Sequence, residues 1–131
     1  FFFFYVSSQD NLENLKMFVK NLSDVVIECT DENRCFIHMS AVYVSNFVNV
    51  MLQIGNKFLE EKSLDVSVLK PLVKETVNKA FAMGADKALT GPARRADFNT
   101  IEKHKIMLND YKDEKKIYEL LTNYIIKKYN K

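Results

Sequence analysis

Two stretches of this chain carry side chains that could do chemistry. The first is a set of polar residues within a long apolar segment: His38, Ser45, Asn46 and Asn49. The second is the segment Thr90–Asp97, which places two arginines and an aspartate around a Gly-Pro corner. Buried polar groups are costly unless they have partners, and loops that bear charge are frequent binding sites. Together the two stretches predict half of a ligand site, and we expect the other half to lie outside this chain.

The polar residues of the first stretch fall on one face if the segment is a helix. At about 100° per residue, their directions and that of Arg34 lie within roughly 60° of one another, with Asn46 at the border. A histidine on such a face can act as a general acid or base. Two interpretations stay open. These side chains hydrogen-bond one another and nearby backbone, or they bind a ligand.

The corner offers groups that suit an anion. Gly91 permits backbone dihedral angles that are forbidden to other residues, and Thr90 offers a hydroxyl group. Arg94 and Arg95 can each hold a carboxylate or phosphate through two parallel hydrogen bonds. Asp97 can orient an arginine or cap the next helix. The alternative is a capped turn with an internal Arg–Asp pair.

Hydrophobic periodicity predicts mainly helical elements around these residues. One helix is expected from about Thr30 to Lys62, with Thr30 or Asp31 as its cap and a length on the order of 45 Å. Apolar residues occupy most of its circumference, so we expect it to be buried nearly all round, in part by a second copy of the chain. Four further helices are predicted: Asp65 or Ser67 to Met83, Ala85 to Leu89, Asp97 or Asn99 to Leu108, and Glu114 to Tyr129 with Asp113 as cap.

The first residues have a different character. The aromatic run 1–6 and the segment Val25–Ile27 are typical of strands, and a helix is expected between them from about Asn11 to Leu22. Strand, helix and strand in this length match a β-α-β unit or the end of a doubly wound sheet. A protein is unlikely to begin inside a buried strand, so we expect the chain to be the C-terminal part of a longer protein.

Composition limits the partners and the compartment. The chain has 131 residues, with 19 basic and 17 acidic side chains. A net charge of +2 gives no reason to expect nucleic acid or a membrane as partner. The two cysteines, Cys29 and Cys35, have the spacing of neither a redox pair nor a zinc site, so we expect free thiols in a cytoplasmic protein and Cys35 packed as a small hydrophobic residue. No metal site is expected.

The chain also lacks the glycine pattern of a dinucleotide-binding turn. It contains three glycines and no GxGxxG motif. Without that turn, the backbone cannot approach a pyrophosphate group closely at a helix N-terminus. We therefore expect no cofactor-binding residues on this chain.

Four motifs, taken in order, resemble one bacterial family. They are His38–Asn49, Leu69–Leu72 with Glu75 and Thr76, Thr90–Asp97, and His104. That family pairs an N-terminal Rossmann-like NADP-binding domain with a C-terminal helical domain of unknown function. The resemblance covers the chain from about Cys29 to Tyr129. It implies that residues 1–29 end a truncated Rossmann-like domain and that 30–131 form an all-helical dimerisation and substrate domain with one long central helix.

The helical domain of this family is similar to the 6-phosphogluconate dehydrogenase C-terminal-domain-like superfamily. In 6-phosphogluconate dehydrogenase, ketopantoate reductase and pyrroline-5-carboxylate reductase, substrate binds between the Rossmann domain and the long helix. Many of these enzymes use a lysine and an asparagine one turn apart on that helix. Asn46 matches the asparagine, whereas Val42 stands where the lysine would be.

The resemblance leads to two hypotheses. In the first, the chain is the dimerisation and substrate-binding domain of an NADP-dependent oxidoreductase, with NADP held mainly by the missing N-terminal domain and the isolated chain inactive. His38 would move a proton during hydride transfer, Asn46, Ser45 and Asn49 would position the substrate, and Thr90, Arg94, Arg95 and Asp97 would bind its anionic group. In the second, the full protein is a non-enzymatic dimeric scaffold or a dinucleotide sensor.

Overall fold

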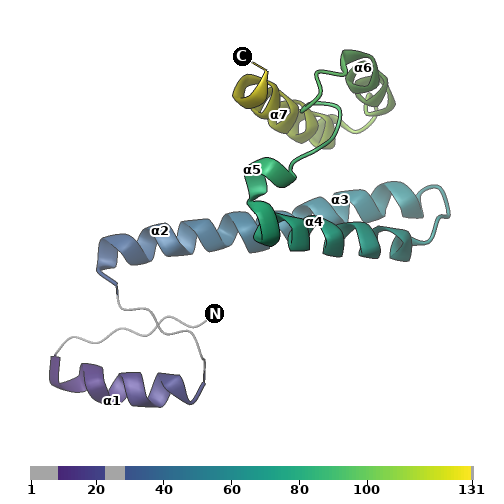
Figure 1. Cartoon of the computed structure of the whole chain (residues 1–131). Coiled ribbons are helices and arrows are strands. Elements are labelled where there is room, and N and C mark those ends of the chain that lie inside the picture. Colours follow the sequence, from purple (N-terminus) through teal and green to yellow (C-terminus); the bar gives the residue numbers. More distant parts are fainter. Residues whose placement is uncertain (1–8, 23–28, 131) are drawn as a thin grey trace. The chain divides into compact units, whose positions relative to one another are not determined.

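The computed structural model is mainly helical (Figure 1). It describes residues 9–22 and 29–130, and all regular elements within those ranges are helical. In chain order they are α1 (Gln9–Lys20), α2 (Asp31–Ala41), the π-helical turn η1 (Val42–Asn46), α3 (Phe47–Glu60), the 3-10 turn η2 (Val66–Val68), α4 (Leu69–Met83), α5 (Ala85–Ala88), α6 (Phe98–Met107) and α7 (Lys112–Tyr129). The mainly helical class is therefore confirmed. Both strands of the expected β-α-β unit fall outside the described residues.

The chain divides into two compact units, 1–49 and 50–131. The division falls within α3, so the long helix belongs to both units. The domain boundary predicted between residues 29 and 30 stays a prediction. In the first unit, α1 occupies the place of the helix predicted at about Asn11–Leu22.

The long helix begins where the capping signal predicts. The hydroxyl oxygen of Thr30 accepts a hydrogen bond from the backbone N–H of Asn33 at 3.2 Å, and Asp31 and Glu32 occupy the first turn. Carboxylates there stabilise the positive end of the helix dipole. From Asp31, α2, η1 and α3 continue as one 30-residue helix to Glu60. The predicted long helix is thus confirmed.

The single chain does not bury this helix, and its burial by a second copy stays a prediction. No residue of α2, η1 or α3 is buried, and Tyr43 and Val44 are 63% and 74% exposed. Cys35, expected to pack as a small hydrophobic residue, is exposed as well. The physical reason is that too few apolar side chains of the same chain lie against the helix to surround it.

By length and composition, the helix Asp31–Glu60 also meets the requirements for crossing a membrane. Its most apolar 18-residue window has a mean hydropathy of 1.4, and none of that window is buried. Interface helices of soluble proteins have the same properties, because apolar residues cover most of their circumference.

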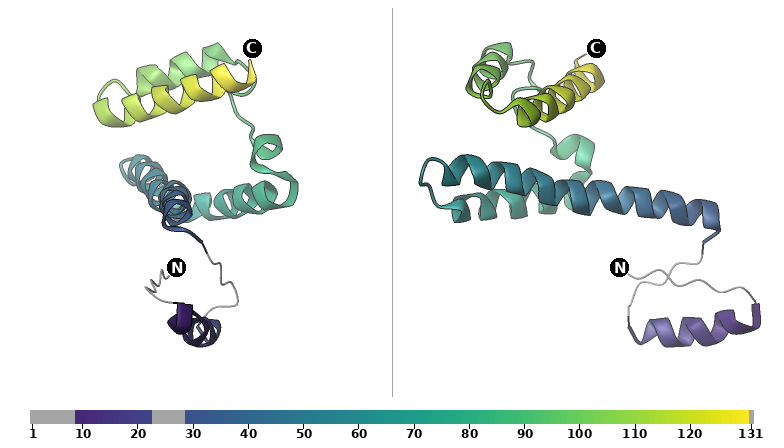
Figure 2. Two further views of the ribbon diagram at one scale, coloured as in Figure 1. Left: turned by 90° about the vertical axis from the view of Figure 1, so that its left-hand side faces the viewer. Right: turned by 180° about the vertical axis from the view of Figure 1, so that it is seen from behind.

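The second unit contains two helical hairpins. Figure 2 shows that the chain reverses direction between α3 and α4, and again between α6 and α7. The side chain of Leu69 on α4 lies close to Gly55 on α3, which has no side chain at this point. Asp65 caps the turn η2, which leads into α4, because its carboxylate accepts the Ser67 N–H at 2.8 Å. Gly84, with a φ of 87°, ends α4. These boundaries agree with the sequence prediction.

The start of α7 differs from the prediction. Asp113 was expected to cap the helix, but α7 begins at Lys112 and Asp113 lies in its first turn. Tyr111 occupies the N-cap position without a side-chain cap. Its ring packs edge-on against Phe58 at 5.1 Å between centroids, and its hydroxyl group donates to Glu61. A tertiary contact therefore fixes this helix start in place of a local cap.

The buried core among the described residues is small. It consists of Ala93, Ile101 and Leu108, together with the hydroxyl-bearing Thr122. Ile101 is 2% exposed, whereas Ile106 on the same helix is 65% exposed. The α6–α7 hairpin and the corner before it therefore supply this core.

The two isoleucines of α6 make a matched test of this core. Ile101→Ala should lower the free energy of unfolding by about 2 to 5 kcal/mol, because it removes buried methyl groups and leaves a cavity. Ile106→Ala makes the same chemical change at an exposed site and should change stability by less than about 0.5 kcal/mol. Urea unfolding followed by circular dichroism measures both. Equal losses in the two variants would contradict the described packing of α6.

Candidate functional site

The predicted site residues fall into two groups on the two units. His38, Ser45, Asn46 and Asn49 lie within residues 1–49, and the segment Thr90–Asp97 lies within residues 50–131. We describe each group by itself. All four residues of the first group are exposed.

Two residues of the first group lie in the π-helical turn. The backbone N–H of Phe47 donates to the carbonyl oxygen of Val42, five residues earlier, and Ser45 and Asn46 lie between them. A π turn holds more residues than an α turn, and such turns occur often at functional sites. The assumption of 100° per residue therefore fails between Val42 and Asn46. The angle between the directions of His38 and Asn49 about the helix axis therefore differs from the value calculated for a uniform α-helix.

Three of the four residues do not follow the first interpretation. Within the described part of the chain, the side chains of Ser45, Asn46 and Asn49 make no hydrogen bond to one another or to backbone. By contrast, Ser40 bonds back to the carbonyl oxygen of Phe36 at 2.8 Å. Three exposed polar groups on an apolar helix thus keep their hydrogen-bonding capacity for a ligand, a partner or water.

The corner has an unusual backbone. Gly91 has a φ of 108°, which L side chains rarely adopt. Ala96 has a φ of 55°, a left-handed conformation that is unfavourable for alanine. Backbone hydrogen bonds stabilise this conformation. The Arg95 N–H donates to the carbonyl oxygen of Gly91 at 3.2 Å, and the Asp97 N–H donates to that of Pro92 at 2.9 Å. Strained backbone of this kind tends to occur at functional sites.

Asp97 caps α6 and does not pair with an arginine. One of its carboxylate oxygens accepts the Thr100 N–H at 3.1 Å, and the other accepts the Thr100 hydroxyl group at 2.7 Å. These bonds stabilise the charged form and hold the pKa of Asp97 below its usual value, with a smaller contribution from Arg95. Of the two roles predicted for Asp97, the structure therefore has the cap.

Both arginines of the corner lack a carboxylate partner among the described residues. Arg94 is half-buried and lies over the ring of Tyr129, with 4.4 Å from the guanidinium carbon to the ring centroid. Arg95 is exposed. The internal Arg–Asp pair, which was the alternative to a ligand site, is therefore not formed.

Thr90 lines a cavity of about 280 Å³ within the second unit. Residues of α3, of the corner and of α7 surround it, together with Leu108 at the end of α6. The lining is mainly apolar and consists of Met51, Ile54, Phe58, Thr90, Pro92, Ala93, Leu108, Glu114, Ile117, Tyr118, Leu121, Thr122 and Ile125. Its size and its few polar groups are typical of a pocket for the carbon skeleton of a small molecule.

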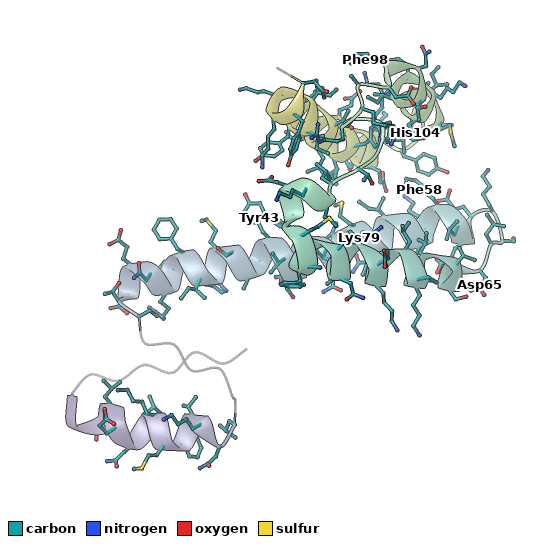
Figure 3. The ribbon with its side chains drawn as sticks, viewed as in Figure 1. Tyr43, Phe58, Asp65, Lys79, Phe98 and His104 are labelled. Carbon is teal, nitrogen blue, oxygen red and sulfur yellow. The ribbon has the colours of Figure 1, made fainter. Side chains whose placement is uncertain are left out.

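Two residues that line this cavity, Glu114 and Tyr118, have polar partners that the sequence analysis did not predict. Lys57 and Glu114 form an ion pair at 2.7 Å, which lowers the pKa of Glu114 and raises that of Lys57. His104 Nδ1 lies 2.9 Å from the hydroxyl oxygen of Tyr118 on α7. His104 is labelled in Figure 3. Because these partners are far apart in sequence, helical periodicity gives no signal for them.

Clusters of metal-binding side chains and the places of the glycines were also compared with the sequence. Within the described ranges, no three His, Cys, Asp or Glu side chains gather in a way that could hold a metal ion. The three glycines, Gly55, Gly84 and Gly91, do not form a phosphate-binding turn, since Gly55 lies inside α3 and Gly84 ends α4.

A family model decides the classification. The model of a domain of unknown function, DUF2520, matches residues 1–125. The chain belongs to the DUF2520 family. A search among curated proteins gave no match.

This DUF2520 chain is also similar to a solved structure. The crystal structure of a putative NADP oxidoreductase from Bacteroides fragilis matches it with a TM-score of 0.89 and 35% sequence identity. The match covers 92% of this chain and 47% of that chain, so this chain spans about half the length of that protein. The two findings together support an oxidoreductase-related helical domain.

The strained corner residue Ala96 gives a test by a single substitution. Ala96→Gly should raise the free energy of unfolding by about 0.5 to 1 kcal/mol, because removing the left-handed strain outweighs the added freedom of the unfolded chain. Ala80→Gly, inside α4, should lower it by about 0.5 to 1 kcal/mol. Urea unfolding measures both. A loss of stability in Ala96→Gly would contradict the φ angle at this corner.

The cap of α6 predicts a pH dependence. Because the pKa of Asp97 is lower in the folded state than in the unfolded chain, its contribution to stability is present above the usual pKa of 3.8 and is lost as the pH falls through the folded pKa. Asp97→Asn keeps a good cap without a titrating group. Its melting temperature should match the wild type at about pH 7 and fall less on acidification to about pH 2.5.

Thermal unfolding by circular dichroism at both pH values checks this prediction. The same fall in the two proteins would show that Asp97 does not titrate with a lowered pKa.

Proposed function

We propose that this DUF2520 chain is the C-terminal dimerisation and substrate-binding domain of an NADP-dependent oxidoreductase that acts on a small anionic substrate. The observation that carries this proposal is the similarity, over 92% of the chain, to a putative NADP oxidoreductase twice as long. The absence of a dinucleotide-binding glycine pattern supports a division of labour, in which a preceding domain binds NADP and this chain binds the substrate. A cytoplasmic location is part of the proposal.

The corner and its cavity supply the proposed substrate contacts. Arg94 and Arg95 lack carboxylate partners among the described residues, so each can hold a carboxylate or phosphate group of the substrate. Thr90 connects the corner with the 280 Å³ cavity, whose apolar lining suits a short carbon skeleton. Asp97 contributes by fixing the start of α6 after the corner.

The exposed polar residues of the long helix supply the proposed chemistry. His38 is the general acid or base that moves a proton on the reacting carbonyl or imine group, because imidazole can donate and accept a proton near neutral pH. Ser45, Asn46 and Asn49 make hydrogen bonds that position the substrate. The π turn at Ser45 and Asn46 supports this assignment, since such turns recur at functional sites.

The proposed dimer covers the long helix. Its exposed apolar residues need a protein or lipid environment. Asn46, Asn49 and Gln53 lie in the middle of the helix, and their amide groups would be costly in lipid without partners. A second copy of the chain can offer both apolar contacts and hydrogen bonds, and we therefore favour a homodimer.

The proposed role of His38 is tested in the longer protein that contains this chain. NADPH oxidation is followed with a panel of small 2-oxo and imino acids, first in the wild type and then in His38→Ala. Removal of a general acid or base should lower kcat by about 100-fold or more. The molecular mass in solution should stay that of the wild type. The control Lys116→Ala, at an exposed position of α7 outside the proposed site, should keep the wild-type turnover.

Three outcomes would contradict the proposal. Unchanged turnover in His38→Ala would remove that residue from the chemistry. No NADPH binding and no turnover by the longer protein would favour the non-enzymatic dimeric scaffold. NADPH binding without turnover of any substrate would favour the dinucleotide sensor.

A further inference from the structure

The side chain of Arg94 is supported on one face. Its guanidinium carbon lies over the ring of Tyr129, 4.4 Å from the centroid, and Tyr129 is the last residue of α7. A guanidinium group held over an aromatic ring still has N–H groups that do not face the ring and can donate hydrogen bonds. Within residues 9–22 and 29–130, no carboxylate pairs with Arg94 and competes for those N–H groups.

Tyr129 is itself held by Asp86 on α5. The Tyr129 hydroxyl group donates to Asp86 Oδ1 at 2.6 Å, and Lys128 Nζ donates to the same oxygen at 2.5 Å. These bonds lower the pKa of Asp86, chiefly through Lys128, and the bond to Asp86 raises the pKa of Tyr129. The phenol therefore stays protonated at neutral pH, and Lys128 balances the negative charge of Asp86.

The backbone next to both side chains is tied as well. The side-chain amide of Asn130 donates to the carbonyl oxygen of Ala93 at 2.9 Å. This bond joins the residue before Arg94 to the residue after Tyr129. Ala93 is 7% exposed and belongs to the small core. An arginine supported in this way loses less conformational entropy on binding than a free surface arginine.

We propose that Arg94 is the primary anion-binding residue of the corner and that Tyr129 and Asp86 are its positioning residues. The ligand is a group that offers two oxygens to a planar guanidinium, a carboxylate or a phosphate. The assignment of this carboxylate or phosphate to the substrate rests on the proposed function. Arg95 is exposed and has no aromatic support, so its contribution is secondary.

The experiment is a titration of the isotope-labelled chain with inorganic phosphate and, separately, with acetate. The Nε–Hε signals of the two arginines are followed by nuclear magnetic resonance at constant ionic strength. In the wild type, the Arg94 signal should shift and saturate with at least one of the two anions. Arg94→Lys should abolish saturation at the corner, because lysine has no planar pair of donors.

Variants of Tyr129 separate positioning from folding. Tyr129→Leu removes the stack and should weaken anion affinity by about two- to five-fold. Tyr129→Phe keeps the ring but loses the bond to Asp86, so its affinity should lie between those of Tyr129→Leu and the wild type. Tyr124→Leu makes the same change at an exposed tyrosine of α7 and should leave affinity unchanged. Amide spectra report whether each variant keeps the wild-type fold.

The possible results have distinct meanings. Unsaturable shifts shared by most basic side chains would overturn the proposal, as would saturation at Arg95 alone. Unchanged affinity in a folded Tyr129→Leu would overturn the positioning role. The proposed enzymatic function is tested by a different measurement, the turnover of the longer protein with and without His38→Ala. Saturation at Arg94 in a protein without turnover would leave the anion site standing and the proposed reaction rejected.

Discussion

The structure depends on one constraint: the long helix carries more apolar surface than its own chain covers. None of the residues in α2, η1 or α3 is buried, and the buried core among the described residues gathers around the corner and the α6–α7 hairpin. Apolar surface of this extent is stable in water only when another surface covers it. The proposed dimer and the proposed preceding domain would each cover part of this apolar surface. The same helix would then serve both assembly and substrate binding.

Local signals in the sequence predicted the helix boundaries well. Thr30, Asp65 and Asp97 each accept a backbone N–H at the start of a helix, and Gly84 ends one, because capping depends on residues within a few positions. The exception is α7. Its first residues are fixed by the contacts of Tyr111 with Phe58 and Glu61, which a local pattern does not contain.

The site could be predicted only in part, for the same physical reason. The corner was recognised from its glycine, proline and charged residues, and its strained φ angles agree with a special role. The support of Arg94 by Tyr129 joins residues far apart in sequence, so periodicity could not reveal it. The π turn was missed as well, because the sequence analysis assumed a uniform helix through Ser45 and Asn46. The expected strands, at residues 1–6 and Val25–Ile27, fall outside the described residues.

The central claim is that a second copy of the chain covers the long helix, and the mass in solution tests it most directly. Light scattering coupled to size-exclusion chromatography should give twice the 15.3 kDa of one chain. Val44→Asp, at a position 74% exposed in the single chain, should shift the mass towards that of a monomer. Lys116→Asp on α7 serves as the matched surface control and should remain dimeric. A stable wild-type monomer with well-dispersed amide signals at high concentration would contradict the account.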